Sequence, residues 1–285
     1  MPRSRPSAIL SRAMAAPIRK LFATQDGEHV TEDQFPAAPE EGLFPASSPT
    51  RAVHTDLTSM MIGGICSLFL QMLHPRALAG VWDHSDFRED MAGRLRRTAR
   101  FVAVTTYGSS ADAGRLCARI NAIHGKVSGT LPDGTPYAAT EPELLGWVHV
   151  TESWSFLAAH LRYLNPYMPR VAQNRYFADM AVIAEKLGAP GMPVTRAGIE
   201  AYMRQARPQL RYDARTKETS AALRSQSAPR PELAPFQRVA MQAGLDLLPD
   251  WARAMHGLRA LPGQRGATRA AAGAMGKATR WIMAG

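Results

Sequence analysis

Apolar residues recur at helical spacing over most of the chain. Between 88 and 107, Met91, Leu95, Thr98, Val102 and Thr105 follow one another at alternating steps of four and three residues, which places them on one face of an α-helix. No clear run of strands and no internal repeat is present in the sequence. The pattern predicts an all-α fold, a compact helical bundle. Glycines and prolines delimit further predicted helices at 170–187, 196–206, 215–225, 236–247 and 250–258.

Capping signals mark two helix starts between residues 107 and 145. Ser109 and Asp112 supply an N-cap residue and a first-turn acid before an apolar stripe that runs to Val127, and Gly129 is expected to end this helix. The stretch LPDGTPY that follows is typical of turns. Thr140 and Glu143 form a capping box around a proline, which predicts a helix from there to about residue 164.

The most apolar run covers residues 57–73, contains two glycines and leads into His74 and Pro75. A membrane-spanning helix needs about 20 apolar residues, so this shorter run predicts a buried core helix. Nearer the N-terminus, Arg12 and Pro17 interrupt the apolar residues of 8–18, which argues against a secretory signal. We expect a cytoplasmic protein with no integral membrane span.

Charge divides the chain into three parts. The net charge of +10 comes from the ends, because residues 1–24 hold five basic residues, residues 253–285 hold six, and neither stretch holds an acid. The body is close to neutral, which argues against a nucleic-acid partner. The basic ends are candidates for weak contact with an anionic membrane surface, which would make the protein peripheral to the membrane.

The same division predicts the domain organisation. Residues 1–50, basic and then acidic and proline-rich, are expected to form an arm without a core of its own. Residues 51–258 are expected to form the helical domain. Residues 259–285 read as a basic Ala/Gly-rich tail, frayed after residue 262.

Several common kinds of site have no support in the sequence. Cys66 and Cys117, the two cysteines, stand far apart in apolar runs, which predicts buried free thiols and neither a disulfide scaffold nor a zinc site. No P-loop, GxGxxG, GxSxG or HExxH motif occurs. The remaining chemistry lies in histidines and arginines on predicted helices.

Two histidines stand among apolar residues of predicted helices. His124 is either a core residue bonded to a carbonyl group or a neutral imidazole facing a cofactor, above all a haem iron. His149 poses the same alternative on the next helix, with Glu152 nearby. The residue pattern leaves both interpretations open.

The run GRLRRTAR at 93–100 places arginines on two faces of one helix. Arg94 and Thr98 share a face with Arg97 to one side, whereas Arg96 and Arg100 point the opposite way, toward solvent. A buried arginine requires an anionic or acceptor partner, such as a propionate, bound dioxygen or a substrate carboxylate. Arg94, and less clearly Arg97, are therefore candidates for chemistry.

A second cluster follows the most apolar run. His74, His84 and Asp86 could be assembled into a non-haem iron triad, but only a known geometry would support that assignment. The competing interpretation for His74 is a helix end and an ordered loop held by polar bonds. The sequence leaves the roles of His84 and Asp86 open.

Several strings in a fixed order resemble the MpaB-type oxygenases, a family formerly catalogued as a domain of unknown function that includes the catalytic domain of the bacterial latex-clearing rubber oxygenases. The resemblance covers roughly 51–258 and is most specific across 71–157. The strings are LQMLHPRALAGVWDHSDFRED, GRLRRTARF, RINAIHGKVSGTLPDGTPY and EPELLGWVHV.

This resemblance implies a globin-like helical core that holds haem b without covalent attachment. The string from Arg119 to Val127 is similar to the one that carries the proximal ligand of the rubber oxygenases, which points to His124 as the iron ligand. Their distal Arg-x-x-Lys-Thr string matches Arg94, Arg97 and Thr98, the catalytic candidates here. Arginine does not ligate iron as lysine can, so a closed, lysine-ligated resting state is not expected.

Two departures from the rubber oxygenases matter. The position of the acid proposed as their base falls near Leu78, and His149 stands where they have another residue. His149 therefore belongs to the MpaB-like branch and is a second candidate for the axial ligand. Arg94 and Thr98, which would donate hydrogen bonds to bound dioxygen or a propionate, complete the cofactor-binding candidates.

The resemblance implies a haem-dependent oxygenase that uses dioxygen on a small apolar substrate, with oxidative cleavage of a carbon–carbon double bond as the candidate reaction. The alternative from another class is a haem-binding or lipid-interacting helical protein without turnover. The residues alone support only a helical protein with candidate buried polar groups.

Overall fold

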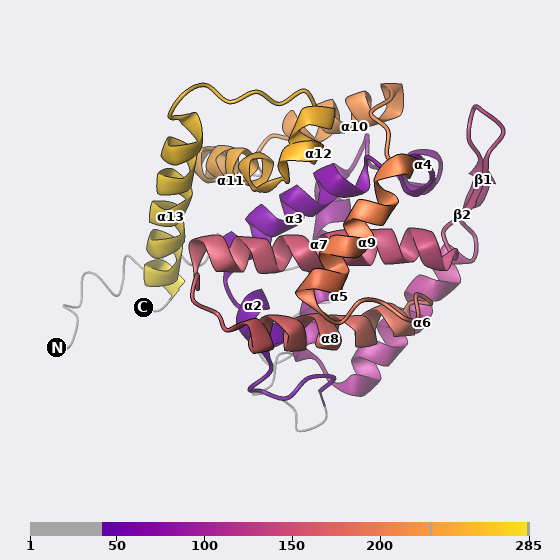
Figure 1. Ribbon diagram of the computed structural model, residues 1–285, viewed down its shortest axis with the longest axis horizontal. Helices are drawn as coiled ribbons and strands as arrows, with labels where there is room; N and C mark the ends of the chain where they lie inside the picture. The colour runs from indigo at the N-terminus through magenta and orange to yellow at the C-terminus, as the bar shows by residue number, and fades with distance from the viewer. Residues whose placement is uncertain (1–41, 229, 284–285) are drawn as a thin grey trace.

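The computed structural model describes residues 42–228 and 230–283 and consists almost entirely of helices (Figure 1). The bounds are α2 (Pro49–His54), α3 (Leu57–Gln71), α4 (Pro75–His84), α5 (Met91–Tyr107), α6 (Ser110–His124), β1 (Ser128–Thr130), β2 (Pro136–Ala138), α7 (Pro142–Tyr163), α8 (Arg170–Lys186), α9 (Arg196–Ala206), η2 (Arg207–Gln209), α10 (Ala214–Arg224), η3 (Pro231–Leu233), α11 (Ala234–Leu247), α12 (Asp250–Met255) and α13 (Gln264–Met283). The predicted all-α bundle is confirmed. The globin-like arrangement stays a prediction.

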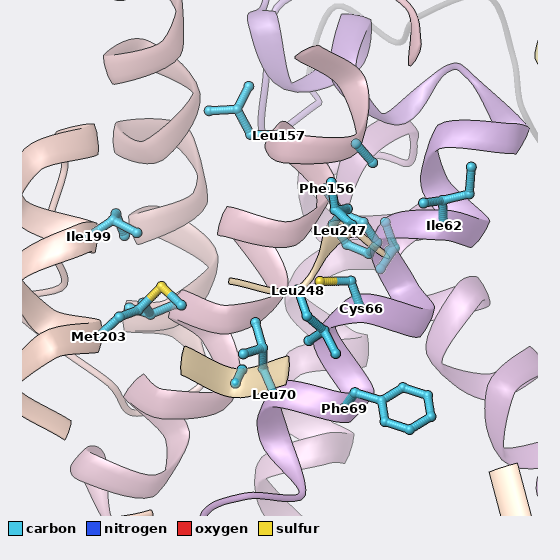
Figure 2. Packing of buried hydrophobic residues seen from close by; sticks show 14 of the residues in the cluster. Ile62, Cys66, Phe69, Leu70, Phe156, Leu157, Ile199, Met203, Leu247 and Leu248 are labelled. Atoms are coloured by element: carbon cyan, nitrogen blue, oxygen red, sulfur yellow. The ribbon is translucent and has the colours of Figure 1, made fainter. Parts of the chain in front are cut away.

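The longest helix, α7, runs through the middle of the bundle. Helix α3 packs along α7 on one side, and α11 packs on α3 in turn (Figure 1). Apolar residues from most of the helices meet in one core, including Cys66 and Leu70 of α3, Phe156 of α7, Met203 of α9 and Leu248 after α11 (Figure 2). The prediction that residues 57–73 form a buried core helix is confirmed by α3.

Short polar side chains start many of these helices. An N-cap side chain accepts a hydrogen bond from a backbone N–H in the first turn, which satisfies one of the donors that a helix start leaves unpaired. Ser109 does this for α6, as its sequence signal predicts. The other caps of this kind are Ser48, Asp56, His74, Asp90, Thr195 and Asp213.

One predicted helix end and one predicted cap are wrong. Helix α6 ends at His124, and residues 128–138 form a short antiparallel hairpin, with Gly129 paired to Tyr137. Helix α7 covers the predicted range but has no capping box, because its N-cap residue is Glu141, which makes no side-chain cap bond, and the Glu143 carboxylate accepts a hydrogen bond from Gln209 Nε2. The Glu141 carboxylate accepts a hydrogen bond from the Ala138 N–H and binds Arg76.

The expectation of a frayed tail after residue 262 is also wrong. Helix α13 packs on α11 and α3, and its arginines reach two buried carboxylates. Arg265 Nε and Arg269 Nε lie 2.6 and 2.8 Å from Asp246, and Arg280 lies 2.8 Å from Asp56. The basic residues that marked a tail are therefore ion-pair partners that fix this helix to the bundle.

Residues 1–41 lie outside the described part of the chain, and with them most of the predicted arm and the region considered for a signal. Both cysteines are buried and unbridged, as predicted. No single helix within 42–228 and 230–283 is long and apolar enough to cross a membrane. Helices α3 and α4 reach that length and composition only together, across a bend of 103°.

Candidate active site

A cavity of about 70 Å³ lies among α2, α5, α6, α7 and α8. Most of its exposed wall is apolar, with aliphatic side chains from α7 and α8 facing Phe101 and Val102 of α5. The polar wall residues are His54, Thr105, His124, His149 and Glu152. The two histidines singled out by the sequence thus face one space, although the chain places them on different helices.

His149 is held inside the bundle by α7. Its side chain is buried, and Nε2 has no hydrogen-bond partner among the described residues. Burial lowers the pKa of His149 to about 4, although a hydrogen bond with the Met180 backbone acts in the opposite direction. The ring is therefore neutral near pH 7, and a neutral imidazole nitrogen can ligate iron.

His124 is the last residue of α6 and is half-buried. Its Nδ1 atom is buried and lacks a hydrogen-bond partner in the described part of the chain. Burial lowers the pKa of this ring as well. The interpretation of His124 as a core residue bonded to a carbonyl group has no support, because no such bond forms between described residues.

Glu152 follows His149 by one turn of α7 and adds a carboxyl group to the same cavity. No other described residue gives this carboxyl a hydrogen bond or an ion pair. Burial raises the pKa of Glu152 to about 7. The cavity therefore contains a carboxyl group that is protonated in a large share of molecules at neutral pH.

His54 of α2 forms the far polar end of this cluster. Its Nδ1 lies 2.7 Å from Thr106 Oγ1 and its Nε2 lies 3.3 Å from the Tyr176 hydroxyl, so both ring nitrogens have partners. Burial, with a smaller contribution from His160, lowers the pKa of His54 to about 3. The sequence does not indicate that His54 lines this cavity, because nothing in the pattern around 49–54 shows that α2 meets α7 and α8.

The three distal candidates on α5 differ in their surroundings. Burial, with a smaller contribution from Arg97, lowers the pKa of Arg94, and no hydrogen bond or ion pair joins its guanidinium to another described residue. Thr98 is exposed and its hydroxyl donates to the Arg94 carbonyl oxygen at 3.2 Å. Arg97 is 58% exposed and pairs with Asp86 at 3.1 Å. Only Arg94 combines partial burial with unused donors, and none of the three lines the cavity.

The three residues considered as an iron triad each bind a different partner and do not form a common site. His74 Nδ1 accepts a hydrogen bond from the Ala77 N–H at the start of α4, as a polar role at a helix end predicts, and Nε2 meets Gln209 Oε1 at 3.1 Å. His84 bonds the Ser128 carbonyl oxygen, and Asp86 pairs with Arg97. Within residues 42–228 and 230–283, no group of three or more His, Cys, Asp or Glu side chains could hold a metal ion.

Comparison with known proteins identifies one family. Residues 51–281 match the family model described as "ER-bound oxygenase mpaB/B'/Rubber oxygenase, catalytic domain". No curated protein and no solved structure matches the chain. The matched range contains every residue of the cavity wall and nearly all of α13.

Proposed function

We propose that this chain, which belongs to the family of mpaB and rubber oxygenase catalytic domains, is a haem-dependent oxygenase acting on an apolar substrate. Membership of this family supports an oxygenase role. The haem, the substrate class and the reaction are our inference. The observation that carries it is the pair His124 and His149, each of which has a buried ring nitrogen without a partner among the described residues on one apolar cavity.

The chemistry of the cavity fits a haem. The wall offers neutral imidazole nitrogens to an iron atom and aliphatic side chains to a porphyrin face. Its volume of about 70 Å³ is half that of a cavity of roughly 150 Å³ that binds benzene. Cofactor binding would therefore require α5 and α6 to move away from α7. When bound, haem would supply the reaction with dioxygen, which no side chain can carry out alone.

In this proposal the chain's own residues bind and orient. His124, the ligand implied by the resemblance, would hold the iron, and His149 is the second candidate for that position. The aliphatic wall of α7 and α8 would exclude water and bind the hydrocarbon part of the substrate. Oxidative cleavage of a carbon–carbon double bond is the reaction that the resemblance suggests.

Arg94 lies outside the cavity wall and would contribute positive charge to a group that extends beyond it. Its half-buried guanidinium donates to no acid among the described residues, since Asp86 acts on it only electrostatically, and such a group is costly unless an anion or another acceptor pairs with it. A haem propionate or a substrate oxygen would meet that need. Arg97 and Thr98 would support this group only indirectly, Thr98 through its bond to the Arg94 carbonyl oxygen.

The test is the absorption spectrum of the purified full chain after reconstitution with haem, with and without dithionite and carbon monoxide. We expect a Soret band that shifts on reduction and again with carbon monoxide. A chain that gives no specific Soret band would exclude the cofactor. A clean spectrum without oxygen consumption in the presence of unsaturated hydrocarbons would favour haem binding without turnover.

Two histidine variants identify which residue binds the haem iron. We expect His124→Ala to lose haem or change its spin state, with partial recovery on adding imidazole, while His149→Ala keeps the wild-type spectrum. The measurement is haem titration followed by absorption and electron paramagnetic resonance. The opposite pattern would move the ligand to His149, and unchanged spectra in both variants would exclude both.

A further inference from the structure

Glu152 is the polar wall residue that the proposed function leaves without a role. Thr105 donates to the backbone oxygen of Phe101 at 2.8 Å, and both nitrogens of His54 have partners. The two remaining histidines are the candidate iron ligands. Glu152 is also the single acid on a wall otherwise made of apolar side chains, histidines and a threonine.

The position of Glu152 is difficult to explain by stability. Glu152 is half-buried, and a carboxyl group that faces an apolar cavity without a protein hydrogen-bond partner stabilises the folded state less than an apolar side chain would. The Tyr176 hydroxyl interacts with Glu152 electrostatically, but its hydrogen bond is with His54. A leucine at residue 152 would match the apolar wall and avoid the cost.

A ligand atom would supply the partner that the protein does not. The cavity wall brings the carboxyl group together with aliphatic residues of α8, among them Met180 and Ile183. A ligand in this space would touch hydrocarbon over most of its surface and one hydrogen-bonding group. Such a wall binds a molecule that is apolar except for one oxygen-bearing end.

We propose that Glu152 is a specificity-determining residue whose carboxyl group hydrogen-bonds the oxygen-bearing end of an otherwise apolar substrate. The inference rests on the proposed function in one respect, because it takes this cavity as the place where the substrate of the oxygenase enters. It assigns a substrate class, namely hydrocarbons that carry a hydroxyl or carbonyl oxygen, in preference to pure hydrocarbons.

The experiment compares phenol with toluene, which share a ring and differ in a hydroxyl for a methyl group. Both exceed the closed cavity of about 70 Å³, so their binding requires α5 and α6 to move away from α7, as haem binding does. Binding to the full chain, before and after haem loading, is followed by the methyl resonances of Met180 and Ile183, which report on this cavity. The variants are Glu152→Gln, which keeps hydrogen bonding, and Glu152→Leu, which removes it. Glu143→Gln is the control, since Glu143 lies on the same helix but outside this cavity.

We expect the wild type and the control to bind phenol about five- to tenfold more tightly than toluene, the value of one buried hydrogen bond. Glu152→Gln should keep most of this preference, and Glu152→Leu should abolish or reverse it. The proposal is overturned if Glu152→Leu keeps the wild-type ratio, or if neither compound shifts the two methyl resonances of the wild type.

The outcome is separable from that of the proposed function. A chain that never binds haem but shows a phenol preference dependent on residue 152 would keep the binding site and end the haem proposal. A haem-binding chain whose preference ignores residue 152 would do the reverse. Loss of haem affinity in Glu152→Gln, with the phenol preference intact in Glu152→Leu, would assign the carboxyl group to the cofactor and overturn the inference.

Discussion

Burial determines the ionisation of single residues around the cavity. It lowers the pKa of His54 to about 3 and of His149 to about 4, and raises that of Glu152 to about 7. At pH 7 the two histidines are therefore neutral and Glu152 is protonated in about half of the molecules, as an apolar environment favours. A cavity with a protonated Glu152 can accept an uncharged substrate without separating ion pairs first.

Glu152 should make stability depend on pH. Its pKa is near 4.5 when unfolded and about 7 when folded, so the folded state binds more protons between these values and the free energy of unfolding falls as pH rises through this window. Glu152→Gln should therefore stabilise the chain relative to wild type more at pH 8 than at pH 5, by roughly 3 kcal/mol at most.

Urea unfolding at both pH values measures this difference. The groups facing Glu152 are His149, His124, His54 and Tyr176, and the histidines stay neutral over most of the range because burial lowers their pKa values. Glu143→Gln, on the same helix, should show no such trend. An equal effect of Glu152→Gln at both pH values would contradict the raised pKa.

At the scale of elements, small residues let the central helices approach closely. A Cβ atom at Gly63 of α3 would lie 2.8 Å from Phe156 Cδ1 and 2.9 Å from the Ser155 carbonyl oxygen, both on α7. At Gly244 of α11 it would lie 2.5 Å from Ile65 Cγ2. The contacts of α3 with α7 and α11 therefore depend on the absence of side chains at these two positions.

Neighbouring glycines give a matched pair for this packing. Gly63→Ala should destabilise the chain by about 1–3 kcal/mol, because the added methyl group overlaps the α7 backbone. At Gly64 the nearest atom would be Phe156 Cε1 at 3.8 Å, so Gly64→Ala should be neutral or stabilising by up to about 1 kcal/mol. Chemical unfolding measures the change in the free energy of unfolding for both variants. Equal changes would contradict the close contact between Gly63 and α7.

One buried acid, Asp246, binds two of the arginines that hold helix α13 to the bundle. Asp246 is 4% exposed and accepts hydrogen bonds from Arg265 and Arg269 of α13 and from Arg162 of α7. Burial acts to raise the pKa of Asp246, but the hydrogen bonds from the two α13 arginines outweigh it and lower the pKa. The ionised acid thus joins α13 to α11 and α7.

Asp246→Asn should loosen α13. It removes the charge that compensates these guanidinium groups, and we expect a loss of about 1–3 kcal/mol, less than for fully buried pairs because the α13 arginines are partly exposed. Hydrogen exchange should increase first in residues 264–283. Asp250→Asn, which removes an exposed carboxylate near Arg265, is the control and should change little. Unaltered exchange in α13 of Asp246→Asn would show that its packing and the Arg280–Asp56 pair hold it without Asp246.

At the scale of the whole molecule, the bundle combines a tightly packed centre with a less crowded side. Helices α3, α7 and α11 form the centre, whereas α5 packs on α6 and on the short α2 (Figure 1). The cavity lies between α5 and α6 on one side and α7 and α8 on the other. Opening the cavity for a large ligand would therefore displace α5 and α6 with the least loss of packing.

Haem uptake should accordingly change the molecule unevenly. We expect slower hydrogen exchange in residues 91–124 after haem loading, because the ligand would fill the space between these helices and α7. Exchange in α3 and α11 should change little and serves as the internal control. A uniform change, or one confined to the centre, would place the ligand elsewhere.

The sequence alone determined the helical class, most helix boundaries between 57 and 258, the free cysteines and the family, because helical periodicity and ordered motifs are local properties of the chain. It also singled out His124, His149 and Arg94. It could not show that α13 is docked, since a basic Ala/Gly-rich segment looks disordered until Asp246 and Asp56 lie opposite its arginines. Nor could it show that Arg97 is exposed and paired with Asp86, or that His54 and His124 face the same cavity as His149 and Glu152. Those relations depend on which helices meet, and only the tertiary structure decides that.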